Sequence, residues 1–90
     1  MVVKRTKIEI ISDMLESLVN KGGSIKPTHL MYKSNLAHGQ MHIYLDELVL
    51  KEFVKKTKKG EYDYVIITDK GCEFMHKLKE MKEFEKAFGI

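Results

Sequence analysis

The chain has 90 residues, of which 43% are apolar and 32% charged, and its formal net charge is +3. This length supports one small domain with its own hydrophobic core. Its one cysteine, Cys72, excludes an internal disulfide. Nothing resembles a signal peptide, and no apolar run reaches the roughly 18 residues of a membrane helix, so a cytoplasmic protein is expected.

The first predicted helix spans about Lys7 to Asn20, where Thr6 can cap the start and Gly22-Gly23 ends the pattern. Its apolar residues recur at steps of three and four, which is typical of a helix with one buried face. These residues are Ile8, Ile11, Leu15, Leu18 and Val19. The preceding residues 2–5 form a short basic arm that is expected to be mobile.

Two further helices are predicted around a tight turn. The second spans Ser24 to Lys33 with Pro27 in its first turn, and Ser34-Asn35-Leu36 is the turn that follows. The third spans about Ala37 to Leu50. Its buried face is expected to hold Met41, Tyr44, Leu45, Leu48 and Val49, and its outer side Gly39, Gln40, Ile43 and Glu47, with His42 at the flank.

Two antiparallel strands are predicted over Phe53 to Lys56 and Tyr62 to Ile67, since both segments are rich in β-branched and aromatic residues. The turn between them runs from Thr57 to Glu61. Residues 51–60 hold five lysines and one glutamate, a local charge of +4. The hairpin is therefore expected to present a basic loop.

A long last helix is predicted from Asp69 to about Phe88. It carries an apolar stripe at steps of three and four, formed by Phe74, Leu78, Met81, Phe84 and Phe88. A helix of this length spans about 28 Å, more than a small three-helix core can cover. Part of the stripe is therefore expected to pack against a second copy of the chain, although packing within one chain is the alternative.

Three segments resemble the archaeal winged helix-turn-helix regulators that include the ten-a chromosomal DNA-binding proteins: Tyr32-Lys33-Ser34-Asn35-Leu36, Gly39-Gln40 and Tyr44-Leu45-Asp46-Glu47-Leu48. Ile67-Thr68-Asp69-Lys70-Gly71 resembles the end of the family's wing. The resemblance implies an α+β winged helix-turn-helix fold, with a three-helix core and two-stranded wing over residues 1–68. Residues 69–90 would then form a C-terminal dimerisation helix.

The same resemblance implies a homodimer that binds double-stranded DNA, with the third helix in the major groove and the wing along the backbone. The residues expected to contact DNA are Lys33, Ser34, Asn35, His38, Gly39, Gln40, His42, Ile43, Lys56, Lys58 and Lys59. Those expected to form the dimer are Phe74, Leu78, Met81, Phe84 and Phe88. Where the family often has glycine after the recognition helix, this chain has Glu52, so that turn is expected to be either strained or built differently.

The residue types in these segments suit DNA, but each has an alternative role. Lysines on a hairpin can neutralise phosphates, or they can protect an exposed strand edge from aggregation. Gln40 can pair with adenine, or serve as an ordinary polar residue of a first helical turn, and Ile43 can touch a thymine methyl. No arginine lies in this segment to recognise guanine, so modest or A·T-leaning specificity is expected.

Other classes of site have little support in the sequence. There is no paired-carboxylate, nucleophile–base or phosphate-cradling pattern, so neither an enzyme nor a cofactor is expected. His38 and His42 lie four residues apart, as do Cys72 and His76, but two ligands do not make a site and no metal is expected. Cys72 alone is expected to be a buried or half-buried apolar residue.

The sequence thus predicts a transcriptional regulator or a nucleoid-associated protein. The rival hypothesis is a winged-helix protein-interaction module within transcription or chromatin machinery.

Overall fold

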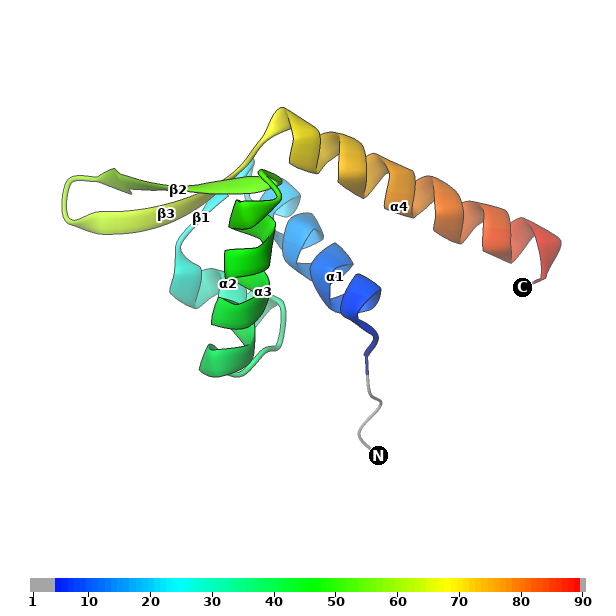
Figure 1. Ribbon diagram of the computed structural model, residues 1–90, viewed down its shortest axis with the longest axis horizontal. Helices are drawn as coiled ribbons and strands as arrows, with labels where there is room; N and C mark the ends of the chain where they lie inside the picture. Colours follow the sequence, from blue (N-terminus) through cyan, green and yellow to red (C-terminus); the bar gives the residue numbers. More distant parts are fainter. Residues whose placement is uncertain (1–4, 90) are drawn as a thin grey trace.

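The computed structural model describes residues 5–89. Their elements, in chain order, are α1 (Lys7–Asn20), β1 (Ser24–Ile25), α2 (Pro27–Lys33), α3 (His38–Leu50), β2 (Val54–Lys59), β3 (Tyr62–Ile67) and α4 (Asp69–Phe88). The first three helices pack beside the base of a small sheet, the β2–β3 hairpin extends to one side, and α4 extends to the other (Figure 1). The predicted α+β winged helix-turn-helix fold with a long last helix is confirmed.

Helix α1 begins and ends where the sequence predicted. The Thr6 hydroxyl accepts a hydrogen bond from the Glu9 amide at 3.2 Å, and the Glu9 carboxylate accepts one from the Thr6 amide at 3.3 Å. The predicted buried face was partly wrong, since Ile8 and Val19 are exposed and Ile10 and Met14 are buried. Residues 2–4 of the predicted basic arm lie outside the described residues.

The predicted second helix was wrong at its start, because Ser24 and Ile25 form strand β1. Ser24 pairs with Ile66 and Ile25 with Val65, both antiparallel, so the sheet has three strands in the order β1-β3-β2. Helix α2 begins only at Pro27. A proline ring disfavours helical geometry in the residue before it. Lys26 is accordingly extended, with φ −73° and ψ 143°.

Strand β2 is longer than predicted and continues to Lys59, which pairs with Tyr62. Only Gly60 and Glu61 connect the strands, and Gly60 has φ 63°, as glycine does in the first position of two-residue hairpin turns. Lys58 and Lys59 therefore occupy paired strand positions rather than a loop. Since β2 is an edge strand exposed to solvent, lysines are well tolerated there.

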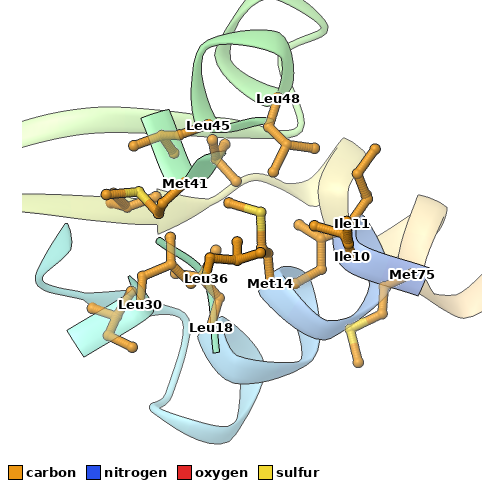
Figure 2. Close-up of a cluster of buried hydrophobic side chains, with 14 residues drawn as sticks. Ile10, Ile11, Met14, Leu18, Leu30, Leu36, Met41, Leu45, Leu48 and Met75 are labelled. Carbon is orange, nitrogen blue, oxygen red and sulfur yellow. The ribbon is translucent and has the colours of Figure 1, made fainter. Parts of the chain in front are cut away.

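The hydrophobic core lies between α1, α2, α3 and the sheet, and α4 adds Met75 to it (Figure 2). Its members at 0–2% exposure include Met14, Leu18, Leu30, Met41, Leu45 and Val65. The core thus anchors the helix-turn-helix and the base of the hairpin to α1. Among the described residues 5–89, no helix is long and apolar enough to cross a membrane.

The end of α3 is a left-handed turn at Glu52, with φ 63°. The Phe53 amide donates to the Leu48 carbonyl and the Glu52 amide to the Val49 carbonyl, both at 3.0 Å, which is the Schellman pattern of a helix end. Of the two options left by the sequence, the strained one is therefore found. A non-glycine residue in this conformation costs roughly 1–2 kcal/mol.

The Thr68–Gly71 motif joins this turn to α4. The Thr68 hydroxyl donates to the Glu52 carbonyl at 2.6 Å and accepts from the Gly71 amide at 3.0 Å, capping α4. Gly71 packs so closely on the Phe53 carbonyl that an added Cβ would clash with it. The motif is thus explained by the close approach of α4 to the start of β2.

Candidate nucleic-acid interface

Helix α3 presents a mixed polar and apolar surface on its outer side. His38, Gly39, Gln40 and Ile43 are exposed, and Ile43 leaves 68% of its surface in solvent. On the inner side Met41, Leu45 and Leu48 are buried, which fixes the rotation of the helix. The four outer residues therefore form one accessible surface on the first half of α3.

The wing and α3 share a groove of about 390 Å³, lined by Pro27, His42, Leu45, Lys56, Thr57, Lys58, Asp63 and Tyr64. Lys56 Nζ lies 3.5 Å from Asp46 Oδ1, an ion pair that links β2 to α3. The structure thus brings His42, Lys56 and Lys58 together at the junction of helix and hairpin.

Strand geometry separates the third predicted wing lysine from the other two. Successive side chains of a strand point to opposite faces, so Lys56 and Lys58 share the face of the buried Val54, and Lys59 lies on the other face. All three lysines are exposed. Lys59 can therefore serve as a control for Lys58, because it carries the same charge on the opposite face of the strand.

The turn between α2 and α3 positions two predicted contact residues differently. Ser34 is only 1% exposed, and its hydroxyl has no hydrogen-bond partner among the described residues. Its side chain therefore lies in the interior and cannot reach a ligand at the surface as expected. Asn35 is exposed with φ 53°, a left-handed conformation that asparagine tolerates.

Lys33 lies in the last turn of α2 and is exposed, but it lines a different groove. That groove is formed with Asp13, Glu16, Ser17, Asn20 and Lys21 of α1 and its end. Lys33 is thus not gathered with the wing lysines at the α3 groove.

Arg5 stabilises the turn between α2 and α3, a role that the sequence did not predict. Its guanidinium donates to the carbonyl oxygens of Ser34 at 2.7 Å and Asn35 at 2.8 Å, and to the Asp13 carboxylate at 2.8 Å. These carbonyls follow the end of α2, where a positive charge is favourable. No local signal could have revealed this, since the turn is 29 and 30 residues away in sequence.

Two polar residues of α3 are engaged within the chain. The Gln40 side chain accepts a long hydrogen bond of 3.4 Å from the Ala37 amide, which caps the helix weakly. Glu47, predicted on the outer side, instead accepts from Lys7 Nζ of α1 at 2.6 Å and is half-buried. Of the residues predicted on the outer side of α3, the three that remain exposed, Gly39, Gln40 and Ile43, therefore all lie in its first two turns.

His38 and His42 lie against each other on α3. Their Nε2 atoms are 3.1 Å apart, and their ring centroids 4.3 Å. Within residues 5–89, no group of three or more His, Cys, Asp or Glu side chains is arranged to hold a metal ion. Cys72 is exposed, so its predicted burial was wrong, because α4 turns Gly71 and Met75 inward and leaves Cys72 on the outer side.

The predicted dimerisation stripe divides into two parts. Leu78 is 4% exposed and packs within the chain, and the half-buried Phe74 stacks on Phe53 with 4.4 Å between ring centroids. Met81, Phe84 and Phe88 are exposed, and Ile8 of α1 lies beside Met81 in a shared surface groove. We call Ile8, Met81, Phe84 and Phe88 the apolar strip.

A family profile described as winged helix-turn-helix matches residues 4–86. The chain belongs to the winged helix-turn-helix family. The uncharacterised protein MJ0290 of Methanocaldococcus jannaschii is 37% identical over 79 residues, which are 88% of this chain and 35% of that protein. The winged helix-turn-helix described here thus spans about a third of that relative's length.

Solved structures share the winged helix-turn-helix fold at low sequence identity. Sso10a-2, a DNA-binding protein from Sulfolobus solfataricus, has a TM-score of 0.81 at 20% identity and covers 93% of this chain and 85% of its own. F93 from STIV, a winged-helix DNA-binding protein, has a TM-score of 0.76 at 19% identity, with coverage of 93% and 95%. A MarR family protein from Bacillus stearothermophilus scores 0.74 at 16% identity, with coverage of 94% and 59%.

Proposed function

We propose that the protein binds duplex DNA as a homodimer, as a transcriptional regulator or a nucleoid-associated protein. Helix α3 enters the major groove, and the wing lies along the sugar–phosphate backbone. The observation that carries this proposal is the groove in which His42 of α3 meets Lys56 and Lys58 of the wing. The DNA-binding proteins with similar folds support it.

The charge on this surface suits a polyanion. Each lysine that neutralises a phosphate releases counterions, so affinity falls steeply with salt and carries little sequence information. Lys56 is partly neutralised by Asp46, whereas Lys58 extends further along the exposed hairpin. We therefore assign the larger phosphate contribution to Lys58.

Sequence preference would come from the first turns of α3. Gln40 can pair with adenine once it gives up its long bond to the Ala37 amide, and the exposed Ile43 can contact a thymine methyl. Gln40→Ala is expected to change the preference between duplexes more than the overall affinity.

The apolar strip supports the homodimer. Phe84 and Phe88 lie 4.7 Å apart between ring centroids on the part of α4 that extends beyond the core (Figure 1). Exposed aromatic rings in a row mark a surface that is covered in the functional assembly. Two-fold symmetry would place the two copies of α3 about 34 Å apart, or a multiple of that, along the duplex.

The test compares Lys58→Ala with Lys59→Ala by measuring duplex affinity at several salt concentrations. Lys58→Ala is expected to weaken binding to all sequences and to lower the salt slope by about 0.9 for one lost phosphate contact. Lys59→Ala removes the same charge from the opposite face and is expected to change both quantities less. An unaltered salt slope in Lys58→Ala would show that this groove does not contact the DNA phosphates.

A protein-docking role is the second candidate, because Ile43 is 68% exposed on α3. It predicts little affinity for random duplex at physiological salt, whereas DNA binding predicts a mobility shift that weakens with added salt. A mobility-shift experiment at two salt concentrations therefore separates the two functions.

A further inference from the structure

We propose that His38 and His42 form a two-histidine chelate for a divalent transition-metal ion at the start of α3. Residues four apart on a helix share one face, and here their Nε2 atoms approach to 3.1 Å. Imidazole nitrogen is a preferred ligand of zinc, copper and nickel. The inference departs from the sequence-based expectation of no metal because the two ring nitrogens converge in the structure.

The separation of the two nitrogens fits a metal ion bound to both. With metal–nitrogen bonds of about 2.0–2.1 Å, nitrogens 3.1 Å apart subtend an angle of about 98° at the metal. This angle lies between the right angle of square or octahedral sites and the wider angle of a tetrahedron. Zn²⁺ has no electronic preference of geometry, so it accepts such an angle and is the probe of choice.

The surroundings leave room for the ion and set its affinity. His38 is exposed, and the neighbouring Gly39 opens onto space with no atom within 4 Å of where a Cβ would stand. Water would complete the coordination, so binding is weaker than in sites with four protein ligands. Asp63, in the same groove as His42, favours a cation there, whereas Lys56 and Lys58 oppose it.

A hydrogen bond between the two rings would give the same distance. In that arrangement one Nε2 carries a proton and donates it to the other, and neither the ring positions nor the fold requires a metal. Metal binding instead requires both Nε2 atoms to be unprotonated. The two interpretations therefore differ in whether added Zn²⁺ binds at these rings.

Isothermal titration of the full chain with zinc chloride tests the chelate. One ion per chain is expected, and His38→Ala and His42→Ala should each weaken binding by at least about tenfold, since loss of even an outer partner of a ligand commonly costs that much. The exposed His29 is the matched control, and His29→Ala should bind as the unmodified chain does. Thermal unfolding of each variant verifies that it folds.

Two results would overturn the proposal. One is the absence of zinc binding by the unmodified chain. The other is loss of binding in His76→Ala with His38→Ala unaffected, which would place the ion at Cys72 and His76 on α4. In NMR spectra, zinc should shift the ring signals of His38 and His42 and leave those of His29 in place.

A consequence for DNA rests on the proposed function. The chelate lies on the surface proposed to meet the duplex, so a bound dication adds positive charge there and should raise duplex affinity, and DNA should raise zinc affinity by the same factor. Zinc should have this effect on the unmodified chain and not on His42→Ala. Zinc binding without any duplex binding would refute the DNA proposal alone, whereas duplex binding without zinc binding would refute the chelate alone.

Discussion

The two halves of α4 carry the same apolar spacing and have different surroundings. In the first half Gly71, Met75 and Leu78 turn toward the core, while in the second half every described residue from Met81 onward is exposed. The spacing of apolar residues thus locates a helix face without identifying what covers it. Neighbouring elements decide that: α1 and the core bury the first half, whereas beside the second half α1 contributes only surface contacts, such as the hydrogen bond from Lys82 Nζ to the Ser12 hydroxyl at 3.2 Å.

The largest expected effect tests this division directly. Leu78→Ala should destabilise the folded chain by about 2–5 kcal/mol, because it leaves a cavity beside the core. The measurement is the free energy of unfolding by chemical denaturation. Phe84→Ala, six residues further along the same stripe, is the matched variant.

Phe84→Ala should leave the monomer's unfolding free energy within about 0.5 kcal/mol of the unmodified value, since the ring is 58% exposed. It should instead weaken self-association, measured by sedimentation as a function of concentration. Equal losses of monomer stability in the two variants would show that the halves of α4 are alike after all.

A second pair of substitutions tests how closely α4 packs against the start of β2. Gly71→Ala should cost about 1–3 kcal/mol, because its methyl group would press on the Phe53 carbonyl and force α4 from β2. Gly39→Ala, where space is open, should instead stabilise α3 by about 0.5–1 kcal/mol. Thermal unfolding of both variants measures the contrast, and a harmless Gly71→Ala would contradict the close approach.

The smallest expected effect is a gain at the turn that supports α4. Glu52→Gly should raise the free energy of unfolding by about 0.5–1 kcal/mol, because glycine adopts the left-handed conformation without steric cost. Denaturation of this variant beside Glu52→Ala provides the measurement. Ala should give no gain, since it suffers the same left-handed strain; an equal gain would assign the effect to the carboxylate.

Much of the fold followed from local patterns in the sequence. Helices α1, α3 and α4 were predicted within one residue of their ends, since each has a periodic face and α1 and α4 have capping threonines. Strand β1 was missed because two residues show no periodicity, and its pairing with β3 is a long-range event. The extent of β2 was underestimated because lysines are poor strand formers away from an edge.

The candidate site was harder to predict, because it depends on contacts between distant segments. The meeting of His42 with Lys58, the burial of Ser34 and the separation of Lys33 all follow from how α3 packs on the hairpin and on α2. Spacing alone placed His38 and His42 on one face, and the convergence of their nitrogens is seen only in the folded structure.

Arg5 is the chain's sole arginine, and its planar group of donors is committed to the protein's own backbone. A lysine there offers one point charge and cannot span two carbonyls and a carboxylate at once, so this position does not tolerate an exchange of one basic residue for the other. Through Arg5, the segment that leads into α1 is therefore tied to the turn that orients α3.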